Sequence, residues 1–203
     1  MKLSKRLNTI YEQIDKTKNI IDVGCDHGLL DIKYVLETSN KALATDISEN
    51  AISSAKKNAL KENVLDKIDF MVTDGLNNIK LSNEDIIISG MGSHTIINIL
   101  NKNINNRLII STHKDIPYLR KKLVEYGYKI ESEIAVFDKK MYVIITFIKG
   151  NIKYNETDYL IGTYLKSNKT YINYLLDKET KIKNKSKIET KLYKILINLK
   201  NTN

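Results

Sequence analysis

The chain of 203 residues has one cysteine, one proline and no tryptophan. A single cysteine, Cys25, excludes an internal disulfide framework and fits a reducing compartment. No apolar run approaches the roughly 20 residues of a membrane-spanning helix, and residues 1–6 lack the apolar core of a signal peptide. We therefore expect a soluble protein of the cytoplasm that does not associate with a membrane.

Acidic residues are fewer than basic ones, because 24 Asp and Glu stand against 33 Lys and Arg, for a net charge of +9 at pH 7. Residues 151–203 carry 11 lysines and 5 acids, a net charge of +6, whereas residues 1–150 carry only +3. A basic C-terminal segment on a nearly neutral body is typical of proteins that bind nucleic acid. Biased codon usage would also enrich lysine, so charge alone leaves the partner open.

Glycine is scarce as well, with eight in the chain, and two of them mark the most informative stretch. Residues 22–30 read Asp-Val-Gly-Cys-Asp-His-Gly-Leu-Leu and overlap the end of a short apolar run. A second short run ends in Asp46. Strand, glycine loop, helix, strand and acid in this order predict a site for an adenosine-containing cofactor. Asp46 would accept hydrogen bonds from both ribose hydroxyls.

The residues of this loop distinguish between two classes of cofactor. A dinucleotide fingerprint needs three glycines, spaced G-x-G-x-x-G, around a pyrophosphate at the helix N-terminus. Only Gly24 and Gly28 are present, and the charge of Asp26 between them would repel a pyrophosphate. The loop instead suits a cofactor with an ammonium, a sulfonium and no phosphate, which is S-adenosylmethionine (SAM). The alternative is an ordinary helix-opening turn with two solvated acids.

The pattern of apolar runs predicts the fold. Buried parallel strands are short and rich in Ile or Val, as are residues 20–23, 42–44, 68–72, 86–88 and 108–110. Ser48 and Asp115 are expected to cap two intervening helices, and Pro117 fits the first turn of the second. The runs 128–136 and 141–148 are too close for a crossover helix and predict an antiparallel hairpin.

These elements together predict an α/β class I SAM-dependent methyltransferase fold over residues 1–152. Its Rossmann-like sheet would have seven mainly parallel strands and end in the hairpin. Residues 153–203 are expected to form a helical coiled-coil hairpin that binds RNA, with residues 177–187 as the turn. One helix would use the seam Ile188, Leu192, Ile195 and Leu199, facing the stripe Leu160, Leu165, Ile172 and Leu176. A monomer is favoured, although this tail could also pair with a second chain.

Two further loops follow predicted strands, at the sheet edge where open α/β proteins bind ligands. After the third strand, Asp74 can accept a hydrogen bond from the adenine N6 amino group, and Gly75 lets the ring approach the backbone. After the fourth strand, Gly90, Met91 and Gly92 open the next helix, so main-chain groups would line the methyl-transfer point. The structural alternatives are a turn acid and a tight helix entry.

Four motifs in this order resemble the bacterial TrmK family of tRNA (adenine-N1)-methyltransferases, which modify adenine 22. They are residues 2–7 (Lys-Leu-Ser-Lys-Arg-Leu), 22–30, 73–76 (Thr-Asp-Gly-Leu) and 89–92 (Ser-Gly-Met-Gly). The helical tail is also similar to the coiled-coil domain of that family. The resemblance implies tRNA as the partner. The chain departs from the family where Ser111, Thr112 and His113 replace Gln-Pro-Asn, and where Ser93 replaces a glycine.

The implied reaction suggests roles for the loop residues. Methylation of adenine N1 is an in-line displacement at a sulfonium methyl, so desolvation and orientation should supply most of the catalysis. A carboxylate near N6 could stabilise the cationic product or take its proton, and Asp26 is the first candidate, with His27 as its orienting partner or as a cofactor contact. Alternatively, Asp26 only binds the methionine ammonium. Asp22 is expected to order the loop or the ammonium.

The predicted site is as follows. The cofactor-binding residues are Asp22, Gly24, Cys25, Asp26, His27, Gly28, Asp46, Ile47, Asp74, Gly75, Gly90, Met91 and Gly92. The catalytic residues are Asp26 and His27, and the RNA contacts are Lys5, Arg6, Ser111 and His113. No metal is expected, because His27, His94 and His113 form no metal-binding motif. The alternative functions are a SAM-dependent methyltransferase for another RNA or a small molecule, and a non-catalytic RNA-binding module.

Overall fold

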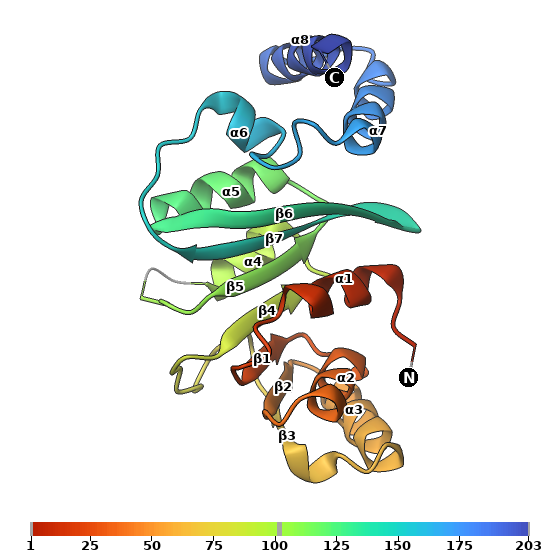
Figure 1. The fold of residues 1–203 in the computed structure, drawn as a ribbon, viewed down its shortest axis with the longest axis vertical. Helices are drawn as coiled ribbons and strands as arrows, with labels where there is room; N and C mark the ends of the chain where they lie inside the picture. The colour runs from red at the N-terminus through yellow and green to blue at the C-terminus, as the bar shows by residue number, and fades with distance from the viewer. Residues whose placement is uncertain (1, 101–102, 203) are drawn as a thin grey trace.

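The computed structural model describes residues 2–100 and 103–202, and it contains one seven-stranded sheet. The strands are β1 (Ile20–Val23), β2 (Ala42–Asp46), β3 (Ile68–Val72), β4 (Asp85–Ser89), β5 (Leu108–Thr112), β6 (Tyr128–Asp138) and β7 (Lys140–Lys149). Their order is β3-β2-β1-β4-β5-β7-β6 (Figure 1). The first five strands are parallel, and β7 runs antiparallel to both β5 and β6. The predicted sheet and its hairpin are therefore confirmed.

Helices cover both faces of the sheet. They are α1 (Lys5–Gln13), α2 (Leu29–Glu37), α3 (Glu49–Lys61), the 3-10 turn η1 (Leu65–Lys67), α4 (Ser93–Ile99), α5 (Ile116–Glu125), α6 (Glu156–Leu160), α7 (Lys169–Thr180) and α8 (Lys187–Thr202). Helices α1, α2 and α3 bury one apolar cluster against the sheet, and α4 and α5 bury a second on the other face. Because strand residues alternate between faces, Ile20 and Asp22 point toward α2, whereas Ile21 and Val23 point away from it.

The two predicted helix caps have different outcomes. Ser48 caps α3, since its Oγ accepts a hydrogen bond from the Ala51 amide at 3.3 Å. Asp115 precedes α5 but makes no capping hydrogen bond, so this prediction was wrong. Its backbone is left-handed (φ 50°), and its carboxylate lies 3.8 Å from Nε2 of His94 instead. Pro117 lies in the first turn of α5, as predicted.

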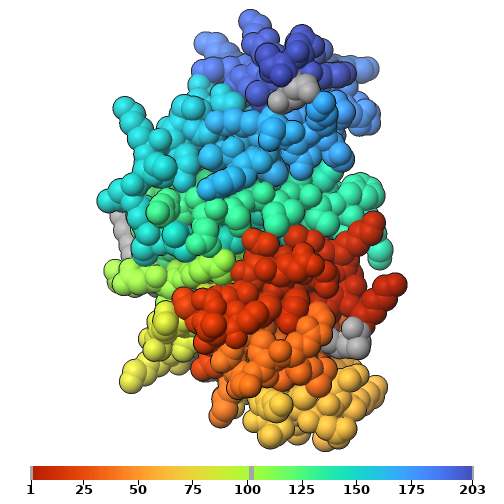
Figure 2. All heavy atoms as spheres, viewed as in Figure 1, coloured from red at the N-terminus to blue at the C-terminus, as the bar shows by residue number. Residues whose placement is uncertain are grey.

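The C-terminal helices α7 and α8 pack against each other at the end of the molecule opposite α3 (Figure 2). Ile172 and Leu176 of α7 are buried, as the predicted stripe requires. In α8 the predicted seam residues Leu192, Ile195 and Leu199 pack against the core, whereas Ile188 is 66% exposed and Leu196, which was not predicted, is fully buried. The buried face of α8 is therefore wider than the predicted seam, and it includes both Ile195 and Leu196.

A buried ion pair attaches the C-terminal segment to the sheet domain. Arg120 on α5 donates from Nε to Oε1 of Glu133 on β6 at 2.7 Å, and neither side chain is exposed. The other guanidinium nitrogens donate to the carbonyls of Tyr159 and Ile161 at 3.0 and 3.1 Å. The backbone around α6 is therefore held by the sheet domain. The domain boundary at residue 152 stays a prediction.

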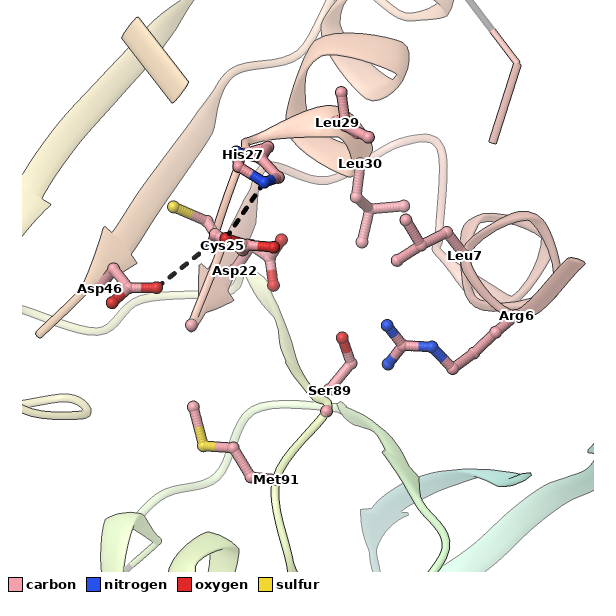
Figure 3. Close-up of a pocket in the computed structure, with 13 residues that line it drawn as sticks. Arg6, Leu7, Asp22, Cys25, His27, Leu29, Leu30, Asp46, Ser89 and Met91 are labelled. Atoms are coloured by element: carbon pink, nitrogen blue, oxygen red, sulfur yellow. Dashed lines mark hydrogen bonds and ion pairs between the residues drawn. The ribbon is translucent and has the colours of Figure 1, made fainter. Parts of the chain in front are cut away.

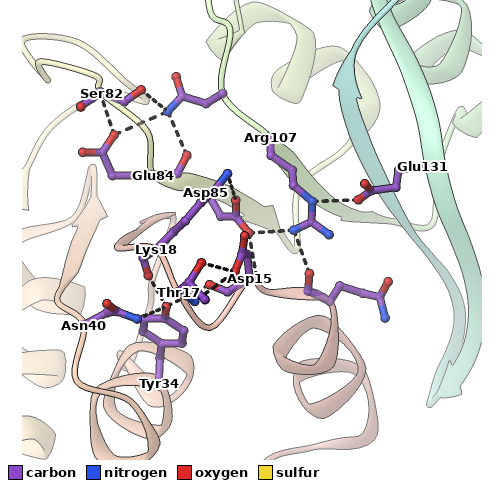
Figure 4. A network of polar contacts seen from close by, with 12 residues as sticks. Asp15, Thr17, Lys18, Tyr34, Asn40, Ser82, Glu84, Asp85, Arg107 and Glu131 are labelled. Carbon is purple, nitrogen blue, oxygen red and sulfur yellow. Dashed lines mark hydrogen bonds and ion pairs between the residues drawn. The ribbon is translucent and has the colours of Figure 1, made fainter.

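At the amino ends of β1 and β4, the buried carboxylate of Asp85 organises a polar network (Figure 4). Its Oδ2 accepts hydrogen bonds from Arg107 Nη1 at 2.7 Å and from the Asp15 amide at 2.9 Å. Lys18 lies 3.9 Å from Oδ1. Two cations thus compensate this buried acid.

Among the described residues, no helix is long and apolar enough to cross a membrane.

Candidate active site

A cavity of about 300 Å³ opens at the carboxyl ends of β1, β2 and β4 (Figure 3). Its wall consists of Arg6, Leu7, Asp22, Gly24, Cys25, Asp26, His27, Leu29, Leu30, Asp46, Ser89, Gly90 and Met91. Eight of the residues predicted to bind the cofactor are in this wall, together with Arg6, which was predicted to contact RNA. Such a volume falls at the lower end of the range typical of small-molecule sites, about 300–1,000 Å³.

Left-handed backbone shapes the loop between β1 and α2. Gly24, Asp26 and Gly28 all have positive φ, between 52° and 82°. The amides of Gly24 and Cys25 donate to the Thr45 carbonyl at 2.8 and 2.9 Å, which ties the loop to β2. A Cβ on Gly24 would lie 2.4 Å from Cε of Met91, so glycine lets the β1 and β4 loops approach each other across the cavity.

Asp46 lies at the end of the cavity formed by β2. Its Oδ2 accepts the Asp26 amide at 3.2 Å, and its Oδ1 accepts the Ser48 amide at 2.9 Å. The next residue, Ile47, is 70% exposed and is not part of the wall. Asp74 and Gly75 are also outside the wall, although the preceding Thr73 donates its amide to the Asp46 carbonyl at 3.0 Å. The β3 loop therefore adjoins this end of the cavity.

The side chains of Asp26 and His27 lie at the cavity mouth, 75% and 58% exposed. Nε2 of His27 is 3.7 Å from Oδ1 of Asp26, and its Nδ1 is 2.9 Å from Oγ of Ser54 on α3. The ring is thus held between the loop acid and α3. Gly28, the other loop glycine, packs against Ala55 of α3 and does not line the cavity.

Beyond Asp46, the side chain of Asp22 projects into the cavity from β1, next to Cys25, and Arg6 enters from α1 on the far side (Figure 3). Burial raises the pKa of the Asp22 carboxyl, while the nearby Arg6 guanidinium opposes the rise. Nη1 of Arg6 and Oδ1 of Asp22 are buried, and neither has a hydrogen-bond partner within residues 2–100 and 103–202. One wall of the cavity thus presents an unused cationic donor and an unused carboxyl acceptor. Cys25, deeper in the wall, is a buried thiol whose pKa burial raises.

Beyond Arg6 the site continues to an aromatic pair that follows β5. The guanidinium carbon of Arg6 lies 5.1 Å from the ring centroid of Tyr142 on β7. The Tyr142 ring meets His113 edge to face, with centroids 5.2 Å apart. Burial, and then Lys140 and Lys114, lower the pKa of His113, which favours its neutral form at pH 7.

The remaining predicted residues lie outside the wall. Ser111 is fully buried in β5, and its carbonyl accepts the Gly90 amide at 3.3 Å. Lys5 is exposed on α1. Gly92 caps α4 just after the cavity-lining Met91. The part of the chain that the structure describes contains no group of three or more His, Cys, Asp or Glu able to hold a metal ion.

Sequence reasoning missed two side chains of this region. Asp31 on α2 is fully buried behind Asp22, and Tyr142 contacts Arg6 from β7. Asp31 left a signal, because it falls on the helix stripe of Tyr34 and Val35 at i, i+3 and i+4, where an acid is unusual. Tyr142 left no signal, since the meeting of α1 and β7 depends on tertiary structure.

A Rossmann-like sheet with a terminal antiparallel hairpin, and an acid-lined cavity at the carboxyl ends of its strands, defines a SAM-dependent methyltransferase. In agreement, the family model described as a methyltransferase domain matches residues 3–145. The tRNA (adenine(22)-N(1))-methyltransferase of Bacillus subtilis (strain 168) is 31% identical over 159 residues, which are 74% of this chain and 67% of that protein. The chain therefore belongs to the TrmK family of tRNA (adenine(22)-N(1))-methyltransferases.

Two solved structures have the same fold. M. capricolum TrmK, in complex with the cofactor product S-adenosyl-homocysteine, superposes with a TM-score of 0.82 at 26% identity, covering 98% of this chain and 97% of that chain. Streptococcus pneumoniae Sp1610, in complex with S-adenosyl-L-methionine, superposes with a TM-score of 0.89 at 24% identity, covering 98% and 100%. These alignments extend over the C-terminal helices as well as the sheet domain.

Proposed function

We propose that this protein transfers a methyl group from SAM to N1 of adenine 22 in tRNA. The observation that carries the proposal is the composition of the cavity. A carboxylate for a ribose lies at one end, and an unpaired cation and acid for an amino-acid group lie at the other. Membership of the tRNA (adenine(22)-N(1))-methyltransferase family supports the substrate.

In this proposal the cavity holds the ribose and the methionine part of SAM, and the adenine lies next to it at the β3 loop. Asp46 would accept both ribose hydroxyls, while Ile47 and the β3 loop, with Asp74 and Gly75, would enclose the adenine. The methionine part would extend past Gly24 to the buried end of the cavity, where Arg6 can bind its carboxylate and Asp22 its ammonium. Arg6, predicted as an RNA contact, is thereby proposed as a cofactor residue.

The target adenine would enter from the side of β4 and β5. When bound, SAM supplies an electrophilic methyl group on a sulfonium, which the adenine N1 lone pair attacks. The loop of Gly90 and Met91 would orient the base through main-chain groups and exclude water. Asp26 is exposed at the mouth, whereas Asp22 already occupies the buried end. We therefore assign Asp26 to the N6 side of the adenine, where it stabilises the developing positive charge.

The proposal is tested with tRNA transcripts that differ at one base. Incubation with SAM labelled on its methyl group should transfer label to a transcript with adenine at position 22. A transcript with guanine at that position, folded in the same way, should accept none. Equal labelling of both transcripts would contradict the proposed target, and labelling of neither would contradict the proposed substrate.

Replacing Asp26 with asparagine should lower kcat for tRNA about 10- to 100-fold, because a hydrogen bond to a charged group contributes about 1.5–3 kcal/mol. The dissociation constant for SAM should stay within about threefold, since the backbone amide of residue 26 still donates to Asp46. Single-turnover methylation and calorimetric titration measure the two quantities. Asp66→Asn, an exposed acid on η1, is the matched control. Full turnover by Asp26→Asn would rule out this role.

Tyr142 is proposed to stack on the flipped-out target base, next to His113. Tyr142→Ala should raise KM for tRNA about tenfold, because stacking of one base on an aromatic side chain contributes about 1–3 kcal/mol. Tyr142→Phe keeps the ring and should retain the KM of the wild type. Steady-state kinetics at saturating SAM distinguish the variants. An unchanged KM in Tyr142→Ala would place the base elsewhere.

The wider context is proposed on the same basis. Lys5 and the lysines of residues 153–203 would contact tRNA phosphates, with the C-terminal helices acting as an RNA-binding appendage. We favour a monomer, in which α7 and α8 pack against each other within one chain. We propose the cytoplasm as its location, because that is where a tRNA substrate would be found.

A further inference from the structure

Two buried acids face each other across the interface of β1 and α2. Asp22 is 4% exposed, and Asp31 is completely buried. The two carboxyl groups are close enough to affect each other's ionisation. Oδ1 of Asp22 and both carboxyl oxygens of Asp31 accept no hydrogen bond from a donor group in the described part of the chain, and the two carboxyl groups are within hydrogen-bonding reach of each other. Buried polar groups are normally satisfied, so this pair requires an explanation.

Three other buried acids, Asp85, Glu133 and Asp158, pair with cations, whereas Oε2 of the buried Glu179 also lacks a hydrogen-bond partner among the described residues. Asp85 accepts a hydrogen bond from Arg107 at 2.7 Å (Figure 4), and Glu133 accepts one from Arg120 at the same distance. A buried carboxylate is costly without such a partner. Asp31 forms no ion pair with a described residue, and its neighbours on α2 are the apolar residues Leu30, Ile32 and Val35.

The pair is connected to the cavity on one side only. Asp22 is part of the cavity wall, and Asp31 lies behind it in the apolar layer between α2 and the sheet. The charged and titratable groups that act on the pair come from three other elements. They are Arg6 on α1 and Asp46 on β2, together with the loop thiol of Cys25, whose pKa both acids raise. Arg6 is the one cation among these groups, so the region as a whole is acidic.

We propose that Asp22 and Asp31 form a binding site for the ammonium of the cofactor's amino-acid end, sharing one proton in the free protein and releasing it on binding. Asp22 would contact the ammonium, and Asp31 is a positioning residue that supplies the second charge. The exchange balances, because one proton leaves to solvent as one ammonium arrives. The inference rests on the proposed function, since it requires that the cavity bind SAM or its product.

The electrostatics of the pair agree with this exchange. Burial raises the pKa of the Asp22 carboxyl to about 7, and burial, followed by repulsion from Asp22, raises the pKa of the Asp31 carboxyl well above its usual value. At a pH between the ordinary carboxyl pKa and the raised pKa of the pair, the folded protein therefore holds a proton that the unfolded chain has released. This contribution to stability is complete below the ordinary carboxyl pKa and is lost as the pH rises through the folded value. A bound ammonium would reverse the loss, because it favours the charged form.

Calorimetry with S-adenosylhomocysteine tests the inference. Titrations at pH 7 in phosphate and in Tris, whose ionisation enthalpies differ, report the number of protons released per ligand bound. For the wild-type protein, the number of protons released per ligand bound should be measurable and should approach one. The Asp31→Asn variant should release no proton. It should bind S-adenosylhomocysteine about tenfold more weakly, because the ammonium then faces one negative charge fewer. Asp66→Asn, an exposed acid, should behave as the wild type.

A second ligand and a second readout distinguish the outcomes. Methylthioadenosine has no amino-acid end, so it should bind the wild type without releasing a proton. The melting temperature of the free wild type should fall between pH 6 and pH 8 more steeply than that of Asp31→Asn. Ligand binding without proton release, or unchanged release in Asp31→Asn, would overturn the inference alone. If S-adenosylhomocysteine does not bind to the wild type, the proposed function is wrong and the inference falls with it.

Discussion

Replacing Asp46 with alanine is expected to weaken SAM binding about 100- to 10,000-fold, because the ribose loses two hydrogen bonds to a carboxylate, each contributing about 1.5–3 kcal/mol. The substitution also removes the acceptor of the Asp26 and Ser48 amides at 3.2 and 2.9 Å. The loop between β1 and α2 would then lose its side-chain tie to β2. Calorimetric titration with SAM measures the affinity directly.

Glu49→Ala provides the control for this substitution, because Glu49 is an exposed acid three residues further along the chain. Its affinity for SAM should equal that of the wild type. The melting temperature of free Asp46→Ala should change little, since the loop still donates the Gly24 and Cys25 amides to the Thr45 carbonyl. An affinity within threefold of the wild type would show that the ribose is bound elsewhere.

Replacing Arg120 with alanine is expected to lower the free energy of unfolding by about 3–5 kcal/mol, the cost of leaving a buried charge without its partner. Glu133 would stay buried, and the carbonyls of Tyr159 and Ile161 would lose their donors. Gly162 adds to the tightness of this junction, since a Cβ there would lie 2.6 Å from Nη2 of Arg120. Urea denaturation followed by circular dichroism gives the free energy.

Two further variants separate loss of the charge pair from loss of packing. Lys122→Ala removes an exposed pair with Glu125 on the same helix and should change stability by less than about 0.5 kcal/mol. The double variant Arg120→Met with Glu133→Leu removes both charges, and it should recover much of the loss. If the free energy of unfolding of Arg120→Ala, measured in the same way, is within about 1 kcal/mol of the wild-type value, this pair does not hold the C-terminal segment.

The sheet could be predicted from the sequence because its strands are nearly continuous apolar runs. Ile86, Ile87 and Ile88 are all completely buried, as expected of a strand covered on both faces. The hairpin was equally clear, since only Lys139 separates β6 from β7. The part of the cavity wall formed by the β1 loop and Asp46 could be predicted from the order of strands and loops along the chain, because parallel strands of such a sheet end at the same edge.

The parts of the site that depend on distant packing could not be predicted. Arg6 was expected to contact RNA, but α1 packs beside β6 and β7 and brings its guanidinium into the cavity. Tyr142 contacts the same guanidinium although it is 136 positions from Arg6 in the sequence, so no local pattern connects the two residues. The full burial of Leu196 on α8, next to the predicted seam residue Ile195, depends on how α8 packs against α7.

Mass spectrometry of a tRNA transcript treated with the protein and SAM tests the central claim most directly. After ribonuclease digestion, the fragment that contains position 22 should gain one methyl group, and its nucleosides should include 1-methyladenosine. Primer extension on the same product should stop next to that position, because a methyl group on N1 blocks base pairing. A methyl group on another nucleoside, or a transcript that stays unmodified while SAM binds, would contradict the account.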